Sequence, residues 1–388
     1  MSNVRDLSRR GFLRITGAAS LLTACAPAAA PSGGPGAAAP AAAPDPGAQP
    51  RPAWEGEWER LVAAAKQEGR LGLMTLVGPG YRKGIDAFQA AFPGIEVEQS
   101  GFVGASAYIP KINEERKAGI YSFDVAQTSL ASMISQVKPT GALDPIRPAI
   151  FRPDVVEDKN WRGGFEQNFA DLARQVVFMF GSVASSLMHY NADLVKPDEI
   201  KSFNDLLNPK WRERIILADV GVGNTYTPMA AVRKALGDEP VKRFIIDQKP
   251  TFSRDTRQIT EAMVRGQYAI ATGVVESLLS EFQSQGLGRQ IKRLDVPEAR
   301  NLNSSSGLML FNRAPHPNAA KLFINWILTK QAQELWCKAT EQNSHRADVA
   351  PSDPETAPLP GAFYLNTQLE GMVQIQDDAR KFLQDLVK

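Results

Sequence analysis

The sequence predicts an α/β protein built as two lobes, each with a mainly parallel sheet covered by helices. Apolar runs of strand type alternate with segments of helical spacing along most of the chain, as parallel sheets with crossover helices require. The chain has 388 residues, whereas a single hydrophobic core rarely grows beyond about 250–300 residues. Extended segments on either side of Gly181 have no helix between them, so we expect a strand there to pass between the lobes.

The first part of the chain shows the alternation clearly. Trp58, Leu61 and Ala65 recur at helical spacing, and Gly69 ends that pattern. An uninterrupted apolar run of strand type follows. The expected elements are then, in order, a strand at 71–77, a helix through 85–92, a strand at 95–97, a helix at 110–117 and a strand at 123–126.

A second alternating series begins after two extended segments. These segments, 175–180 and 186–190, are the expected crossing. The later elements are a strand at 215–219, a helix at 227–236, a strand ending near 252, a helix at 256–264, a strand at 268–272, a strand at 308–311 and a helix at 318–328. We therefore assign 54–180 and 307–388 to lobe 1 and 181–306 to lobe 2.

The N-terminus has the order of an export signal. Arg9 and Arg10 precede an apolar run at 15–22, which is too short to span a bilayer, and small residues lead to Cys25. The arginine pair resembles a twin-arginine signal, and Leu22-Thr23-Ala24-Cys25 resembles a bacterial lipobox. Residues 1–24 are therefore expected to be a signal peptide, with lipid on Cys25 holding the protein at a membrane.

Residues 25–53 are expected to form a tether. Apart from the cysteine, nearly all are Ala, Pro or Gly, a composition that buries too little apolar surface to offset the entropy of ordering. The folded part is expected to begin near Trp54.

Charge and cysteine content argue against a nucleic acid partner and against an internal disulfide bond. The chain has 44 Lys and Arg against 42 Asp and Glu, and removal of residues 1–24 leaves 40 against 41. Without a basic surplus to neutralise phosphates, nucleic acid is not an expected partner. With Cys25 lipidated, Cys337 has no partner for an internal disulfide, and its apolar helical context suits a small buried side chain.

Several phrases together resemble one family, the extracellular solute-binding proteins of bacterial ABC transporters. Within it the resemblance is strongest to the ferric-iron-binding-like branch of the type 2 periplasmic binding proteins. The phrases are Phe92-Pro93-Gly94-Ile95-Glu96-Val97, Glu115-Arg116-Lys117-Ala118-Gly119, Ser122-Phe123-Asp124-Val125, Tyr190-Asn191, Asn208-Pro209-Lys210-Trp211, Arg265-Gly266-Gln267-Tyr268-Ala269-Ile270 and the stretch 314–323. The resemblance implies two α/β lobes, hinge strands between them, a ligand bound between the lobes, a periplasmic location and an ABC permease as partner.

One departure from that branch concerns the ligand. Iron-binding members typically carry two adjacent tyrosines after the strand that corresponds here to 268–272, whereas this chain has Gly273-Val274-Val275-Glu276. Ferric iron prefers hard anionic oxygen ligands, which valine lacks. We therefore expect no metal and no cofactor, and favour a small polar organic solute, an anion included, with ferric iron as the alternative.

Candidate ligand residues follow from the rule that ligands lie beyond the carboxyl ends of strands. In lobe 1 the loops after successive strands offer Tyr81, Ser106 and Thr128. A plain turn explains the glycines around Tyr81 equally well. Helix capping explains Ser106 equally well.

In lobe 2 the same rule selects a strand-to-helix loop with Asn224, Thr225 and Tyr226. Arg254 follows a strand and could hold a carboxylate, although a surface position or an ion pair between the lobes is also open. Its neighbour Asp255 is expected to cap a helix.

Glu276 is the last candidate. It could pair with an amine or hydroxyl of the ligand, or simply stabilise the dipole of the helix that it begins.

An enzyme is the competing class. The chain has three histidines, far apart, and no His-x-x-x-His, Cys-x-x-Cys or Gly-x-Ser-x-Gly motif. We therefore expect a binding protein, most simply a monomer. A binding protein that serves a sensor in place of an importer stays open, as does an exported enzyme.

Overall fold

The computed structural model describes residues 52–196 and 198–388, without the side chain of Ser106. The predicted signal peptide and nearly all of the tether, Cys25 included, lie outside the described residues. Within the described part, no helix is long and apolar enough to cross a membrane.

The first sheet has the strand order β2-β1-β3-β13-β4, and β5 pairs beside β4 on β13. β1 is parallel to β2 and β3, whereas β13 returns antiparallel to β3. The strands are β1 (Arg70–Leu76), β2 (Glu96–Phe102), β3 (Val125–Thr128), β4 (Leu143–Asp144), β5 (Phe178–Met179) and β13 (Gly307–Phe311).

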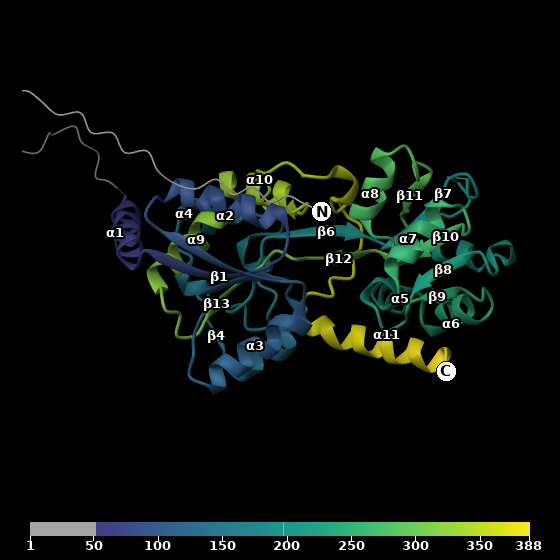
Figure 1. Cartoon of the computed structure of the whole chain (residues 1–388), viewed down its shortest axis with the longest axis horizontal. Coiled ribbons are helices and arrows are strands. Elements are labelled where there is room, and N and C mark those ends of the chain that lie inside the picture. The colour runs from purple at the N-terminus through teal and green to yellow at the C-terminus, as the bar shows by residue number, and fades with distance from the viewer. Residues whose placement is uncertain (1–51, 197) are drawn as a thin grey trace, which may run out of the picture. The chain divides into compact units, whose positions relative to one another are not determined.

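Helices cover this sheet on both faces (Figure 1). α1 packs on α9, and α2 packs on α10. The helices are α1 (Ala53–Glu68), α2 (Pro79–Ala91), α3 (Ala105–Lys117), α4 (Pro153–Val156), α9 (Pro317–Ile327) and α10 (Lys330–Ala339). Gly84 lets α2 approach α10 closely, because a Cβ there would lie 2.2 Å from the buried ring of Trp336.

The second sheet has the order β11-β7-β10-β8-β9. β10 is parallel to β8 and β8 to β9, while β7 is antiparallel to both β10 and β11. The strands are β7 (Met188–Asn191), β8 (Ile215–Ala218), β9 (Thr251–Ser253), β10 (Ile270–Thr272) and β11 (Ile291–Leu294), and the helices are α5 (Gly223–Leu236), α6 (Asp238–Ile246), α7 (Thr256–Val264) and α8 (Glu276–Ser284).

A small sheet joins segments that are far apart in the sequence. β6 (Gly181–Ser185) lies between β12 (Asn301–Asn303) and β14 (Asn343–Ser344) and is antiparallel to both. Figure 1 shows β6 and β12 running between the two larger sheets. The expected crossing at Gly181 is therefore a paired strand, and the predicted α/β class with two lobes and hinge strands is confirmed.

Short helical turns fill the connections. They are Met133–Val137, Lys138–Thr140, Arg147–Ala149, Asp158–Asn160, Phe165–Asn168, Phe203–Leu207, Pro209–Trp211, Pro297–Ala299, Pro354–Thr356 and Glu370–Met372.

The C-terminal helix does not pack where its lobe assignment places it. The prediction puts 307–388 in lobe 1, but α11 (Val373–Leu386) packs on α5. Leu383 is fully buried in the core of the second sheet, and Ala379 is buried beside Ala230. The apolar face of α11 is therefore covered by lobe 2, because the stretch before it crosses beside β12, where Leu365 bridges to Asn301.

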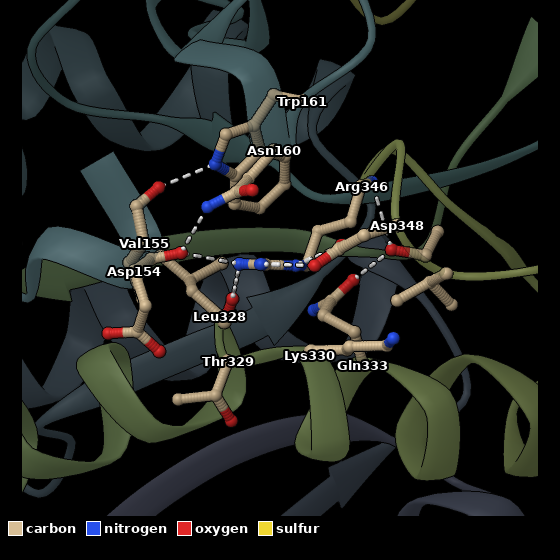
Figure 2. Close-up of polar contacts among 12 residues, drawn as sticks. Asp154, Val155, Asn160, Trp161, Leu328, Thr329, Lys330, Gln333, Arg346 and Asp348 are labelled. Atoms are coloured by element: carbon tan, nitrogen blue, oxygen red, sulfur yellow. Dashed lines mark hydrogen bonds and ion pairs between the residues drawn. The ribbon is translucent and has the colours of Figure 1, made fainter. Parts of the chain in front are cut away.

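A buried arginine fixes the chain after β14 (Figure 2). Arg346 is 2% exposed, and its guanidinium grips both oxygens of Asp348 at 2.8 and 2.9 Å. It also donates to the carbonyls of Asp154 and Leu328 at 3.0 Å each, and it lies 5.5 Å from the ring centre of Trp161. Because every charge there is paired, this cluster positions the stretch that leads into residues 352–356.

Candidate functional site

A cavity of about 740 Å³ lies where the second sheet meets the crossing strand and the C-terminal stretch. The second lobe contributes residues from β7, α5, the β10–α8 loop, α8 and β11. The end of α10 and the stretch around 352–356 close the other side. The lining residues are Val183, Ser185, Leu187, His189, Asn224, Gly273, Val274, Glu276, Ser277, Ser280, Arg293, Lys338, Thr340, Glu341, Gln342, Ser352, Asp353 and Thr356.

Two helices begin at this cavity. α5 starts at Gly223 and α8 starts at Glu276, and neither has a side-chain cap, because their N-cap residues are Val222 and Val275. Asn224 and Ser277, each in a first turn, line the cavity. Uncapped N–H groups and the positive end of the helix dipole make such a place favourable for a carboxylate or phosphate.

The backbone that leads into α8 requires glycine. Gly273 lines the cavity at φ +82°, and a Cβ there would lie 2.8 Å from Cβ of Ala218. Both the conformation and the space disfavour any side chain. The loop therefore brings its backbone, rather than a side chain, to the cavity wall.

A network of polar contacts runs along one wall of the cavity. His189 Nε2 donates to Glu276 Oε1 at 3.0 Å, and Arg293 Nε donates to the same oxygen at 2.9 Å. Arg293 also reaches Asp353 at 2.9 Å and Glu355 at 3.4 Å. This arginine therefore ties β11 and α8 to the C-terminal stretch across the cavity.

The same network of contacts sets the protonation state of Glu276. Burial acts to raise its pKa, but the hydrogen bonds and charges of His189 and Arg293 outweigh burial and lower the pKa to about 2. Glu276 therefore remains a carboxylate at any physiological pH. The Nδ1 atom of His189 is buried and has no hydrogen-bond partner among the described residues, so this ring nitrogen is available to a ligand.

The rest of the cavity lining suits a polar ligand. Hydroxyl and amide side chains are the most frequent polar groups, and none of the lining residues is Phe, Tyr or Trp. Two cationic side chains, Arg293 and Lys338, face three carboxylates, those of Glu276, Glu341 and Asp353. A molecule with several hydrogen-bonding groups fits this lining better than an apolar or a flat aromatic one.

The structure brings two of the eight predicted ligand residues, Asn224 and Glu276, to this cavity. Thr225 is fully buried, and its Oγ1 bonds to the Ala218 carbonyl at 2.9 Å and to Thr272 Oγ1 at 2.8 Å. Tyr226 packs against the second core, and burial raises the pKa of its phenol. Neither Thr225 nor Tyr226 lines the cavity.

Arg254 does not line the cavity. Its side chain is 91% exposed and pairs with Asp219 at 3.0 Å. Asp255 caps α7 as expected, because its Oδ1 accepts from the amides of Arg257 and Gln258 at 2.9 and 3.2 Å. Arg254 is thus a surface ion pair within lobe 2.

Two lobe 1 candidates, Tyr81 and Thr128, also lie outside the cavity lining. Tyr81 is buried in the first core with its ring 6.3 Å from that of Trp336, and burial raises the pKa of its phenol. Thr128 is fully buried at the end of β3, opposite Gly307. Ser106 lies in the first turn of α3, and its side chain is outside the described part.

Sequence reasoning missed His189, Arg293 and the residues at 338–356. Arg293 gave a weak signal, since Lys292 and Arg293 interrupt an apolar strand pattern. Nothing local marks Lys338 or Asp353, because Lys338 lies at the end of α10 and Asp353 on the stretch after β14, and only the tertiary fold brings both to this cavity.

The described residues contain no group of three or more His, Cys, Asp or Glu that could hold a metal ion. This chain has valines at the positions that correspond to the tyrosine pair of the iron-binding branch. Val274 contributes to the cavity wall, and Val275 forms the N-cap of α8.

Comparison with known proteins identifies the family. Residues 83–360 match the model of the bacterial extracellular solute-binding proteins. The chain belongs to this family, as the sequence phrases suggested.

Individual relatives are distant. Iron uptake protein A2 of Synechocystis is 22% identical over 243 residues, which cover 56% of this chain and 64% of that protein. The chain thus spans less than two thirds of the length of this curated relative. Among solved structures, iron-bound HitA from Pseudomonas aeruginosa has a TM-score of 0.57 at 19% identity and covers 82% of this chain and 99% of its own.

A second solved structure supports the same fold. The ferric iron-binding protein A of Mannheimia haemolytica, in an open conformation, has a TM-score of 0.63 at 15% identity and covers 82% and 98% of the two chains. At these identities the likeness establishes the two-lobed fold.

Proposed function

We propose that this protein is the substrate-binding component of an ABC importer and captures a small polar organic solute in the cavity beside α5 and α8. The observation that carries the proposal is the meeting of two uncapped helix N-termini with hydroxyl and amide side chains in one 740 Å³ space. Family membership supports a binding role.

The solute is expected to carry a carboxylate or phosphate group. The N-termini of α5 and α8 favour an anion, and Asn224 and Ser277 are positioned to add hydrogen bonds. Further hydroxyls or amines of the solute would meet serines and threonines of the wall and the carboxylate of Glu276. Because Glu276 is already shared by His189 and Arg293, it is a fixed acceptor for such a donor.

Ferric iron is the second candidate. Its support is the naming of the relatives, which include iron uptake and ferric iron-binding proteins. Its weakness is chemical, because the cavity lining offers no phenolate and two of its three carboxylates, those of Glu276 and Asp353, are held in ion pairs with Arg293. An iron site here would have to displace Arg293 from Glu276 and Asp353.

Binding and closure are linked in this proposal. A ligand that contacts both walls favours the closed arrangement by its higher affinity for that state. Arg293 joins the walls without a ligand through Asp353 and Glu355. The lobes that move would be 54–180 with most of 307–388, and 181–306 with α11.

The location and partners are proposed from the sequence. The twin-arginine signal would export the chain to the periplasm, and lipid on Cys25 would anchor it there, with 25–53 as the tether. A monomer would then deliver its solute to an ABC permease and catalyse no reaction. If the receiving partner is a sensor in place of a permease, solute binding and closure stay the same. Only the protein that recognises the closed form differs.

A thermal-shift screen of the purified protein tests the proposal. The panel contains organic acids, phosphorylated sugars, polyamines and ferric iron. Saturable stabilisation by an organic acid or a sugar phosphate is expected. Stabilisation by ferric iron alone, with a charge-transfer colour, would refute the organic solute and favour the second candidate.

A further inference from the structure

A second recess lies on the first lobe, at the C-terminal end of α3 and the turn after β13. It measures about 630 Å³. Its lining residues are Asn113, Arg116, Lys117, Tyr121, Thr140, Gly141, Asn312 and Arg313. Three of these are cationic and none is acidic, whereas the cavity beside α5 and α8 mixes both signs.

The two arginines are arranged around one phenol. The guanidinium carbons of Arg116 and Arg313 lie 5.3 and 5.2 Å from the ring centre of Tyr121. Arg313 also donates to the Tyr121 hydroxyl at 2.6 Å. Arginine stacked on an aromatic ring keeps its charge and most of its donors available, so the ring orders the two cations without neutralising them.

Arg116 has a second set of contacts that fixes its direction. It donates to the Gly141 carbonyl and to the carbonyl and side-chain oxygens of Asn312, each at 3.4 Å. These acceptors are neutral. Within the described residues, Arg116, Lys117 and Arg313 make no ion pair with a carboxylate, although Lys111 on the same helix does, with Glu115 at 2.5 Å.

The backbone at Arg313 is also unusual. Its φ is +59°, a left-handed conformation that costs a non-glycine residue of this kind about 1 kcal/mol or more. The conformation places Arg313 beside Tyr121 and opposite Arg116. Strain of this kind is often retained where a side chain must be held in a particular place.

We propose that this recess is a binding site for a phosphoryl group, separate from the solute cavity. Holding three cations close together costs electrostatic energy, and a doubly charged anion bound among them removes that cost. Two guanidinium forks match the oxygens of a phosphoryl group, and the Lys117 ammonium adds a point charge. Asn113 and Thr140 supply neutral hydrogen-bonding groups at the rim.

The phosphoryl group has two possible sources, which share this chemistry. It can belong to free phosphate or to the headgroup of an anionic phospholipid. No residue lines both the recess and the solute cavity, so the two sites can be tested independently.

Titration calorimetry with inorganic phosphate and flotation with vesicles separate the two sources. The vesicles contain phosphatidylcholine alone or with phosphatidylglycerol. The variants are Arg116→Gln/Arg313→Gln, the milder Lys117→Gln, and Asn224→Ala/Ser277→Ala as the control in the solute cavity. The milder variant guards against misfolding of the double variant, because Lys117 is exposed.

The expected result is binding in one of the two arms, weakened about tenfold or more by the double variant, weakened less by Lys117→Gln, and retained by the cavity control. Binding that falls as salt rises is expected as well. Binding in neither arm would overturn the proposal. So would binding that only the cavity control abolishes, and that result would leave the proposed function intact.

Discussion

His345 shows how its surroundings set the protonation of a single side chain beside the crossing strand. Its Nδ1 donates to Asn168 Oδ1 and its Nε2 accepts from the hydroxyl of Ser182 on β6, each at 2.8 Å. Burial, together with the charge of Arg162, lowers the pKa of this imidazole to about 4. The neutral ring is therefore built into the contact between β6 and the stretch after β14.

This histidine predicts a pH dependence of stability. In the unfolded chain the imidazole takes up a proton near pH 6.5, whereas in the folded protein it stays neutral until about pH 4. The free energy of unfolding should therefore be highest above pH 6.5 and fall as the pH drops from 6.5 towards 4, by up to about 1.4 kcal/mol per pH unit.

Urea unfolding at pH 7.5, 5.5 and 4.5 measures this dependence. The variant His345→Gln should be less stable at pH 7.5 and show a flatter fall between pH 6.5 and pH 4.5. The same slope in variant and parent would contradict the assignment to His345.

At the scale of elements, the contact of α2 with α10 depends on a missing side chain. Gly84→Ala would place a Cβ within 2.2–2.9 Å of three ring atoms of Trp336, and that ring is fully buried. The helices would have to separate, so we expect a loss of about 1–3 kcal/mol in the free energy of unfolding.

The matched control is Gly56→Ala in α1. A Cβ at Gly56 meets only the end of the Arg60 side chain at 3.7 Å, so alanine should leave stability unchanged or raise it by up to about 1 kcal/mol. Equal effects of the two substitutions in denaturant unfolding would show that α2 and α10 are not packed as described.

Local sequence patterns predicted the start of a helix well where a single capping residue determines it. Asp255 with Gln258 indicated the start of α7, and Asp255 does cap it, although the Gln258 side chain bonds to Ser253 in place of the cap backbone. The helix predicted at 110–117 starts too late, because α3 begins at Ala105 and carries Pro110 inside. Its first turn packs on the end of β2, a tertiary contact that no local pattern reports.

The candidate site was predictable only in part, for a similar reason. The strand-end rule found Asn224 and Glu276, since both begin helices after strands of one sheet. It also selected Thr225, which is next to Asn224 but is fully buried, and Arg254, which follows β9 and is exposed to solvent. Loop position does not determine the direction of a side chain.

At the scale of the whole molecule, the return of the chain completes the cavity. The Arg346 cluster holds the stretch after β14 against the first lobe, and Asp353 and Thr356 further along contribute to the cavity wall. α11 then packs on the second lobe. The C-terminal part therefore contacts both lobes, which explains why the two alternating series alone could not predict the wall formed by residues 338–356.

The central claim is that a solute binds beside the N-termini of α5 and α8. Titration calorimetry with the organic acid or sugar phosphate that stabilises the protein most tests it, on Asn224→Ala, Ser277→Ala and the exposed control Arg254→Ala. Loss of a hydrogen bond to a charged group costs about 1.5–3 kcal/mol, so each cavity variant should bind about tenfold or more weakly, and the control should bind as the parent does. Equal affinity of all three variants and the parent would contradict the account.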